Sequence, residues 1–117
     1  MRLKPNTLIV VAGPTASGKT ALAIQIAKAV DGEIVSADSM QIYRGVDIAT
    51  AKPTPEELAA VPHHLIGFLP MDRAFSVADY AELARKEIND ILSRGKVPVL
   101  CGGTGLYIKA IVDNVQY

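Results

Sequence analysis

The sequence predicts an α/β protein with a mostly parallel sheet, because strand-like and helix-like segments alternate along its 117 residues. Hydrophobic residues make up 50% of the chain and charged residues 21%, which provides enough apolar surface to bury one core. There is no internal repeat and no low-complexity tract, so we expect a folded unit rather than a disordered chain. The 12 basic residues balance the 12 acidic ones, and the basic residues near the start are too sparse to mark a nucleic-acid-binding patch by themselves.

The chain shows no sign of membrane insertion or secretion. Its longest purely apolar run, residues 8–12, is too short for a membrane span of about 18 residues or for a signal-peptide core of about 7–15. Cys101 is the only cysteine and cannot form an internal disulfide. This fits a reducing compartment, although it fits a small buried apolar residue equally well. We predict a cytoplasmic monomer.

The first half of the chain is predicted to form a strand, a helix, a second strand and a loop. Residues 7–12 are a short, continuously apolar run before a Gly-Pro pair, which predicts a buried strand. Apolar positions cover most of residues 18–30, which predicts a largely buried helix that stops at an Asp-Gly pair. Residues 33–37 predict a second strand, and residues 38–53 lack clear periodicity and predict a loop.

The second half begins with a short helix at Thr54, where threonine, proline and glutamate supply a capping box. Residues 64–69 predict a third strand. The clearest helix covers residues 76–94, and its apolar residues fall on one face. Residues 97–101 predict a fourth strand, and a last short helix starts from Leu106 after a glycine-rich turn.

The strongest motif lies between the first predicted strand and the first predicted helix. It matches the phosphate-binding pattern G-x-x-x-x-G-K-[ST] in full and consists of Gly13, Pro14, Thr15, Ala16, Ser17, Gly18, Lys19 and Thr20. The glycines let backbone N–H groups converge on phosphate oxygens, Lys19 supplies a positive charge, and Thr20 supplies a ligand for magnesium. The simpler interpretation is a glycine-rich turn that caps a helix, but the register of strand, loop and helix favours a polyphosphate site. The motif therefore predicts a P-loop NTPase-like three-layer fold.

A phosphate-binding loop does not say which group is transferred. A GTPase is disfavoured because the N-K-x-D and D-x-x-G motifs are absent. The predicted strand at residues 97–101 ends in Cys101 rather than in the acidic residue that marks an ATPase metal site. The nearest acidic candidate is Asp38, which follows the second predicted strand at the sheet edge where ligands bind. From its position alone, Asp38 is equally an N-cap or turn residue.

Five ordered blocks of the sequence together resemble the tRNA dimethylallyltransferases of the bacterial type. The blocks span nearly the whole chain and are residues 13–20, Ser36-Ala37-Asp38-Ser39-Met40-Gln41-Ile42-Tyr43, Thr50-Ala51-Lys52-Pro53, His63-His64-Leu65 and Gly102-Gly103-Thr104-Gly105-Leu106-Tyr107. Members of that family are much longer. The resemblance therefore implies that residues 1–117 are the N-terminal part of a P-loop transferase core domain. The remaining sheet and a helical insertion that grips the anticodon stem-loop are expected downstream.

The resemblance implies a prenyl transfer to tRNA. A dimethylallyl group would pass from dimethylallyl diphosphate to N6 of the adenine that is 3′-adjacent to the anticodon, with release of diphosphate. Breaking the allylic C–O bond requires fixed positive charge on the leaving group. Lys19, the amides of the loop and a magnesium ion near Thr20 would provide this charge, so Lys19 counts among the implied catalytic residues.

The resemblance also implies roles for residues outside the loop. Asp38 would orient the adenine amine and take its proton, with Thr104 as its partner. A threonine in a glycine-rich turn is otherwise a helix N-cap. Ser39, Met40 and Gln41 would join Asp38 and Thr104 in contacting the tRNA, because an enzyme that acts on a base must first extract it from the stack. Met40 is equally a packing residue.

His63 and His64 are adjacent, so on a strand their side chains point to opposite faces and do not easily bind one metal ion. No second cysteine or acidic residue stands at the spacing of a zinc site. We interpret the two histidines as loop or strand-edge residues.

Other classes of function remain open. A small-molecule or nucleotide kinase would use the same loop for ATP, with Asp38 as the base on a hydroxyl group. An adenylate-type isopentenyltransferase would prenylate a free nucleotide, and a non-catalytic nucleotide-binding module would bind without forming product. A comparison of turnover with ATP and turnover with dimethylallyl diphosphate distinguishes the kinase from the prenyltransferases. We expect residues 1–117 alone to be inactive on tRNA, because they leave a sheet edge unpaired and lack the insertion.

Overall fold

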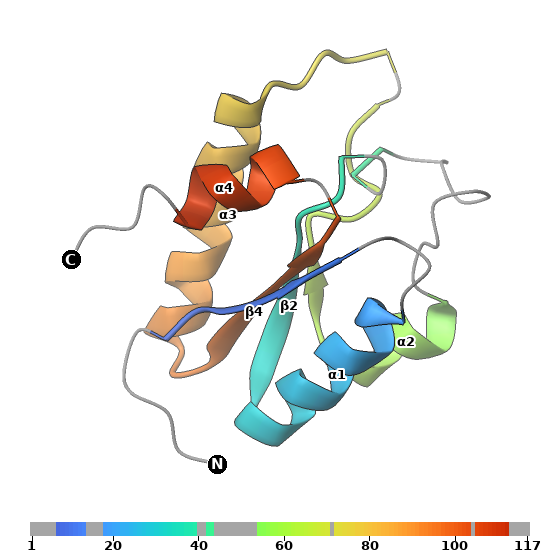
Figure 1. Ribbon diagram of the computed structural model, residues 1–117, viewed down its shortest axis with the longest axis vertical. Helices are drawn as coiled ribbons and strands as arrows, with labels where there is room; N and C mark the ends of the chain where they lie inside the picture. The colour runs from blue at the N-terminus through green and yellow to red at the C-terminus, as the bar shows by residue number, and fades with distance from the viewer. Residues whose placement is uncertain are drawn as a thin grey trace.

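Four parallel strands form the centre of the part of the chain that the structure describes, in the order β1-β4-β2-β3 (Figure 1). They are β1 (Ile9–Ala12), β2 (Gly32–Ser36), β3 (His63–His64) and β4 (Val97–Gly102). The computed structural model describes residues 7–13, 18–39, 42–43, 54–70, 72–103 and 105–112. The parallel sheet confirms the α/β class predicted from the alternation of strands and helices.

The last strand in the chain, β4, lies between the first two. Its pairing with β1 runs from Ile9 opposite Val99 to Ala12 opposite Gly102. Its pairing with β2 ends at Ser36 opposite Cys101. Because all the strands are parallel, the carboxyl ends of β1, β4 and β2 meet at one edge of the sheet, which is where ligands bind in open α/β sheets.

Within the described residues, four helices cover the two faces of the sheet. They are α1 (Lys19–Val30), α2 (Pro55–Ala60), α3 (Val77–Ser93) and α4 (Gly105–Val112). Helix α1 packs against β1, β2 and β4 and contacts α2, whereas α3 packs against β2 and β4 and contacts α4. Figure 1 shows α1 and α2 on one side of the sheet and α3 and α4 on the other. The predicted three-layer arrangement is therefore confirmed.

Neighbouring residues of the central strands belong to different core clusters. Ile34 and Val99 pack with the α1 side, whereas Val35 and Leu100 pack with the α3 and α4 side. Each is at most 3% exposed. Side chains alternate between the faces of a strand, so the middle of a strand that is covered on both faces is apolar at successive positions. This explains the successive apolar residues in the middle of β2 and β4.

The third predicted strand is shorter than expected. The pattern predicts an extended segment over residues 64–69, but β3 pairs with β2 only at His63 and His64. Leu65 has a φ of 66° and Gly67 a φ of 65°, and these left-handed conformations interrupt the extended chain. The backbone regains parallel pairing only at an isolated bridge between Leu69 and Tyr43. The other predicted helices and strands agree closely with the structure.

Helix α1 is less buried than its composition predicts. Ala23, Ile24, Ala27 and Val30 face the sheet and are buried, but Leu22 is 50% exposed. One helix face meets the sheet, and the opposite face lies towards solvent. The helix is therefore amphipathic in place, although its sequence is apolar on most sides.

A buried carboxylate connects β2, β3 and the end of α3. Glu33 accepts hydrogen bonds of 2.5 and 2.9 Å from Arg94, and His64 Nε2 lies 2.7 Å from the same carboxylate. The hydrogen bonds from Arg94 lower the pKa of Glu33 to about 2, with a further contribution from His64, although burial opposes the shift. His64 Nδ1 also lies 3.1 Å from Glu87 on α3. The cluster ties the short edge strand β3 to the rest of the fold.

The interpretation of the histidine pair as strand-edge residues is confirmed by their place in β3. His63 Nδ1 lies 2.8 Å from the carbonyl oxygen of Val61, and burial lowers the pKa of His63. Among the residues that the structure describes, no group of three His, Cys, Asp or Glu side chains is arranged to hold a metal ion.

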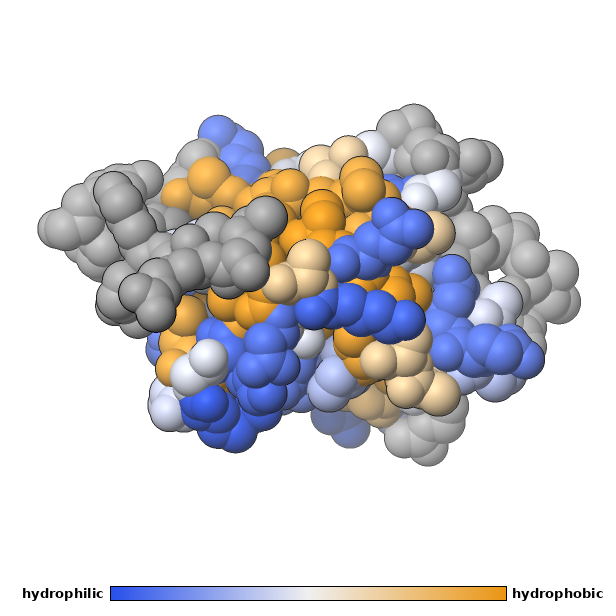
Figure 2. All heavy atoms as spheres, turned by 90° about the horizontal axis from the view of Figure 1, so that it is seen from below, coloured by the Kyte–Doolittle hydropathy of each residue, from blue (hydrophilic) through white to orange (hydrophobic). Residues whose placement is uncertain are grey.

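Apolar residues also remain at the surface. Figure 2 shows the molecule from below, where hydrophobic residues gather over the middle of the face and hydrophilic residues border them. Val10 on β1 is 39% exposed, and Leu106 on α4 is 66% exposed. Among the described residues, β1 pairs only with β4, so its other edge is open. None of the helices in the described ranges is long and apolar enough to span a membrane.

Candidate active site

The carboxyl edge of the sheet carries the described part of the phosphate-binding motif. Strand β1 ends at Ala12, and helix α1 begins at Lys19 directly after Gly18. Gly18 has φ 77° and ψ 15°, a left-handed conformation that glycine adopts without strain. Gly18 is the N-cap residue and has no side chain to cap the helix, and the N-terminus of a helix favours an anion. The local backbone therefore fits a phosphate site.

Lys19 is buried at the start of α1, with only 6% of its surface exposed. Its carbonyl oxygen accepts a 3.9 Å hydrogen bond from Cys101 Sγ, which links the helix to β4. Among the described residues, no carboxylate oxygen lies within 4 Å of the Lys19 ammonium group. A buried ammonium group is costly unless an anion accompanies it, so this position favours a negatively charged ligand.

Asp38 lies two residues beyond β2 and is 7% exposed. The amide of Ala37 donates a 2.8 Å hydrogen bond to the carbonyl oxygen of Cys101, which continues the β2–β4 pairing beyond the end of β2. Opposite this bond, a Cβ on Gly102 would lie 2.3 Å from the carbonyl carbon and oxygen of Ala37. Glycine is required there because the two backbones touch. This contact holds Asp38 beside the end of β4.

The Cys101 thiol lies within the electrostatic influence of both Lys19 and Asp38. Burial raises the pKa of Cys101, the Lys19 charge opposes that rise, and the Asp38 charge adds to it. The thiol therefore stays protonated, which fits the alternative of a small buried residue rather than a nucleophile. Hydrogen bonds of Cys101 to Lys19 and to Ala37, the residue before Asp38, link both segments to the end of β4.

Two stacked tyrosines support the end of β2 from the face of the sheet that α3 and α4 cover. The Tyr80 and Tyr107 rings lie 4.0 Å apart between centroids, with 11° between their planes. The buried Tyr80 hydroxyl donates a 2.8 Å hydrogen bond to the carbonyl oxygen of Ser36. Burial raises the pKa of Tyr107, and the nearby Tyr43, Asp38 and Asp79 raise it further. Helices α3 and α4 thereby stabilise the segment that leads into Asp38.

The structure brings the described candidate residues to one edge of the sheet. Gly13 follows β1, Gly18, Lys19 and Thr20 begin α1, and Asp38 and Ser39 follow β2. The remaining candidates, whose positions lie outside the described residues, are Pro14, Thr15, Ala16, Ser17, Met40, Gln41 and Thr104. The Thr20 hydroxyl and the Asp38 carboxylate at this edge are oxygen donors of the type that magnesium prefers.

Sequence reasoning missed the supporting roles of Tyr80, Tyr107 and Cys101. The apolar face of the helix at residues 76–94 indicated that Tyr80 is buried, and the structure confirms this. It did not indicate that the hydroxyl group would bind Ser36, because that contact joins residues 44 positions apart. A tyrosine on a buried helix face is the available signal, since a buried hydroxyl needs a partner.

Comparisons with known proteins agree with this geometry. The model of the family described as IPP transferase matches residues 41–117. The chain is 58% identical over 109 residues to a tRNA dimethylallyltransferase of Roseiflexus sp. (strain RS-1), covering 93% of this chain and 36% of the relative. It is 53% identical over 109 residues to a tRNA dimethylallyltransferase of Staphylococcus aureus (strain MRSA252), covering 93% of this chain and 35% of the relative. The chain thus spans about a third of the length of these curated relatives.

Solved structures give the same result. The full-length tRNA isopentenylpyrophosphate transferase of Bacillus halodurans is similar with a TM-score of 0.89 and 49% identity, over 95% of this chain and 37% of that protein. A eukaryotic dimethylallyltransferase acting on tRNA is similar with a TM-score of 0.86 and 33% identity, over 94% of this chain and 27% of that protein. These similarities and the sheet confirm the P-loop-type fold.

Proposed function

Because the chain belongs to the IPP transferase family, we propose that it forms the diphosphate-binding and catalytic edge of a tRNA dimethylallyltransferase. The reaction transfers a dimethylallyl group from dimethylallyl diphosphate to N6 of the adenine 3′-adjacent to the anticodon and releases diphosphate. The observation that carries this proposal is that buried Lys19 and buried Asp38 lie at one sheet edge on either side of Cys101. The Cys101 thiol donates a hydrogen bond to the Lys19 carbonyl oxygen, and the Cys101 carbonyl oxygen accepts one from the amide of Ala37, which precedes Asp38. Lys19 can bind an anionic leaving group, and Asp38 can accept a proton.

The loop and the start of α1 bind and stabilise the leaving group. The diphosphate takes the electron pair of the allylic C–O bond as that bond breaks, so negative charge grows on its oxygen atoms. Lys19 and the backbone N–H groups of the loop would bind this charge before the reaction begins. The Thr20 hydroxyl would hold a magnesium ion, which supplies further charge neutralisation when bound. The buried, unpaired state of Lys19 among the described residues supports this assignment.

The segment after β2 orients the attacking adenine amine and accepts its proton. As the N6–C bond forms, the amine must lose one proton, and the Asp38 carboxylate accepts it. Thr104 acts beside it on the same amine and the transferring group. Ser39, Met40 and Gln41 hold the extracted adenine. The rigid support of Asp38 by the Ala37–Cys101 hydrogen bond favours such a positioning role.

We also propose the domain organisation implied by the family. Residues 1–117 form the N-terminal part of the core domain, and the remaining sheet and an anticodon-binding helical insertion follow. The open edge of β1 and the exposed Val10 support further sheet beside this strand. A tRNA substrate agrees with a cytoplasmic location, and we expect one copy of the protein to act on one stem-loop.

The experiment compares substrates in a full-length enzyme that carries these residues. Dimethylallyl diphosphate is supplied with an anticodon stem-loop or with adenosine monophosphate, and ATP is supplied in a third reaction. We expect prenylated stem-loop alone. Prenylated adenosine monophosphate would indicate the adenylate-type transferase, phosphoryl transfer from ATP would indicate a kinase, and binding without product would indicate a nucleotide-binding module.

A second measurement tests the domain organisation. Purified residues 1–117 and the full-length enzyme are compared at equal concentration with the stem-loop and dimethylallyl diphosphate. We expect no prenylation by the shorter chain, because it lacks the insertion that grips the stem-loop. Comparable rates would show that these residues suffice and would contradict the proposed organisation.

A further inference from the structure

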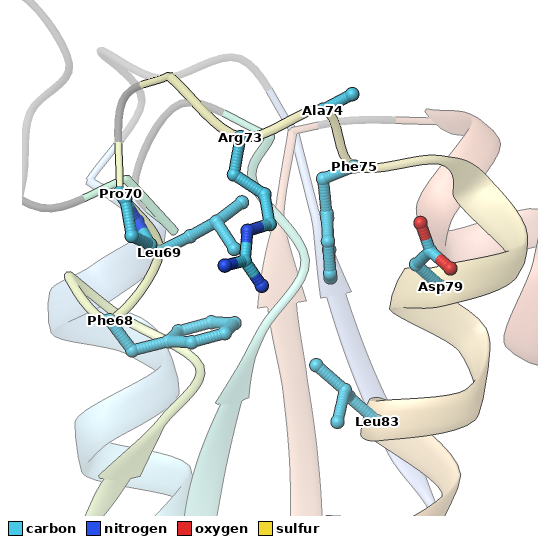
Figure 3. A pocket seen from close by; sticks show the side chains of 8 residues that line it. All are labelled: Phe68, Leu69, Pro70, Arg73, Ala74, Phe75, Asp79 and Leu83. Carbon is cyan, nitrogen blue, oxygen red and sulfur yellow. The ribbon is translucent and has the colours of Figure 1, made fainter.

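A pocket of about 470 Å³ lies between the segment after β3 and the first turns of α3. Figure 3 shows Phe68, Leu69 and Arg73 directed into it from one side and Phe75 and Leu83 from the other, with Asp79 at the rim. The rings of Phe68 and Phe75 meet edge to face, with centroids 6.2 Å apart and planes at 81°. The pocket therefore has aromatic walls, an arginine directed into it and a carboxylate at its rim.

The pocket adjoins the segment to which the proposed function assigns adenine contacts. The amides of Phe68 and Leu69 both donate 3.0 Å hydrogen bonds to the carbonyl oxygen of Ile42. Tyr43 forms an isolated parallel β-bridge with Leu69, and the Tyr43 hydroxyl donates a 3.4 Å hydrogen bond to the carbonyl oxygen of Arg73. A wall of the pocket is thus bonded to residues that directly follow Gln41 in the chain.

The side chains define the chemistry of a ligand. Phe68 and Phe75 pack partly against the core, which accounts for their apolar character but not for a pocket with an arginine beside them. Arg73 is exposed, and no carboxylate of the described residues lies within 4 Å of its guanidinium group. Asp79 accepts a 2.9 Å hydrogen bond from the Ser76 amide and presents a fixed acceptor. Aromatic faces, a cation and an acceptor together fit a nucleotide.

We propose that this pocket binds the nucleotide next to the extracted adenine, with its base on the Phe75 ring and its phosphate at Arg73. The proposal rests on the tRNA substrate proposed above. Extracting one adenine removes the stacking partner of its neighbours, and a phenyl ring replaces that partner whatever the identity of the base. The pocket thereby stabilises the opened loop while the adenine occupies the reaction site.

Photocrosslinking tests the contact in the full-length enzyme. Anticodon stem-loops carry 5-iodouridine on either side of the target adenine, because this base crosslinks efficiently to an aromatic ring on which it stacks. After irradiation, mass spectrometry identifies the linked residue. We expect a link to Phe75 from one of the two positions. The link should be lost in Phe75→Leu, which keeps apolar volume, and retained in Phe75→Tyr, which keeps the ring.

Binding measurements supply an independent readout. Phe75→Leu should weaken stem-loop affinity roughly 5- to 150-fold and leave the affinity for dimethylallyl diphosphate unchanged. Arg73→Ala should weaken stem-loop binding and reduce its salt dependence by about 0.7 in the slope of log affinity against log salt. Arg85→Ala is the matched control, because Arg85 is exposed on α3 and does not line the pocket. Circular dichroism confirms that each variant folds.

Two results overturn the proposal. If the wild-type enzyme prenylates the stem-loop but no link reaches Phe75, and Arg73→Ala binds as the Arg85→Ala control does, another ligand or chain segment occupies the pocket and the proposed function stands. If the wild-type enzyme neither binds nor prenylates the stem-loop, the proposed function fails together with this site.

Discussion

The Tyr80 hydroxyl donates a 2.8 Å hydrogen bond to the carbonyl oxygen of Ser36, the last residue of β2. Both groups are buried, and burial raises the pKa of Tyr80, so the donor keeps its proton throughout the physiological range. The contact fixes α3 against the strand that leads to Asp38. Stacking of Tyr107 on Tyr80 brings α4 to the same point.

Tyr80→Phe should destabilise the fold without disturbing the stack. The phenyl ring still packs on Tyr107, but the hydrogen bond to the buried Ser36 carbonyl is lost, at a cost of about 1–3 kcal/mol. Urea unfolding measures this change. Tyr43→Phe is the control, because its bond to Arg73 is longer, at 3.4 Å, and exposed. Equal stabilities of the two variants would contradict a structural role for the Tyr80 hydroxyl.

Gly102→Ala should destabilise the fold more than the addition of one methyl group suggests. The new Cβ would lie 2.3 Å from backbone atoms of Ala37, which cannot move aside as a flexible side chain can. We expect a loss of about 1–3 kcal/mol or more, together with a displaced Asp38. Gly105→Ala provides the matched control, because a Cβ there meets no atom within 4 Å. Thermal unfolding that ranks Gly105→Ala as the more damaging variant would refute the close approach.

Lys19→Ala should separate binding from stability. A charge-assisted hydrogen bond contributes about 1.5–3 kcal/mol, so the affinity for dimethylallyl diphosphate should fall roughly 10- to 150-fold. Stability without ligand should change little, because no carboxylate in the described part of the chain pairs with Lys19. Titration calorimetry and thermal unfolding measure the two effects. Lys28→Ala, an exposed change in the last turn of α1, controls for loss of charge. Unaltered affinity in Lys19→Ala would remove the loop from the mechanism.

Asp38→Asn in a full-length enzyme should lower turnover and spare diphosphate binding. Asparagine keeps the shape of the side chain but cannot take the proton, and loss of a general base costs about 10²–10⁴ in rate. Affinity for dimethylallyl diphosphate depends on Lys19 and the loop amides and should stay nearly constant. Both quantities are measured at two magnesium concentrations. Weaker binding that added magnesium restores would identify Asp38 as a metal ligand rather than a base.

Acid should remove the stabilisation provided by Glu33. Its pKa is lowered from 4.5 to about 2 by Arg94, so the contribution is complete above about pH 4.5 and is lost as the pH falls towards 2. Glu33→Gln should therefore reduce stability at pH 7 and flatten the loss between these values. Urea unfolding at several pH values tests this. Glu56→Gln, an exposed change on α2, is the control for the loss of one carboxylate. If the stability of Glu33→Gln falls with pH as steeply as that of the wild type, groups other than Glu33 cause the acid sensitivity.

The elements of this fold are predictable because their signals are local. The capping box at Thr54 forms as the sequence predicts, and the structure shows a second one at Ser76, where the sequence predicts the start of a helix. Strands β1 and β4 were recognisable from their apolar runs, since helices cover both faces of the sheet. The phosphate-binding motif likewise needs only a strand, a loop and a helix in succession. Gly18 and Lys19 accordingly lie where the motif predicts.

The tertiary structure decided what distant residues do together. Nothing local indicates that β4 enters between β1 and β2, yet this order brings Cys101 beside Lys19 and the Ala37 backbone, and so brings Lys19 and Asp38 to one edge. The partners of Tyr80 and Glu33 depend on the same packing. The apolar pattern at residues 64–69 failed for a related reason, because left-handed conformations at Leu65 and Gly67 ended β3 early. Side-chain periodicity specifies which face of an element is buried, whereas the pairing of elements depends on the free energy of the whole packed core.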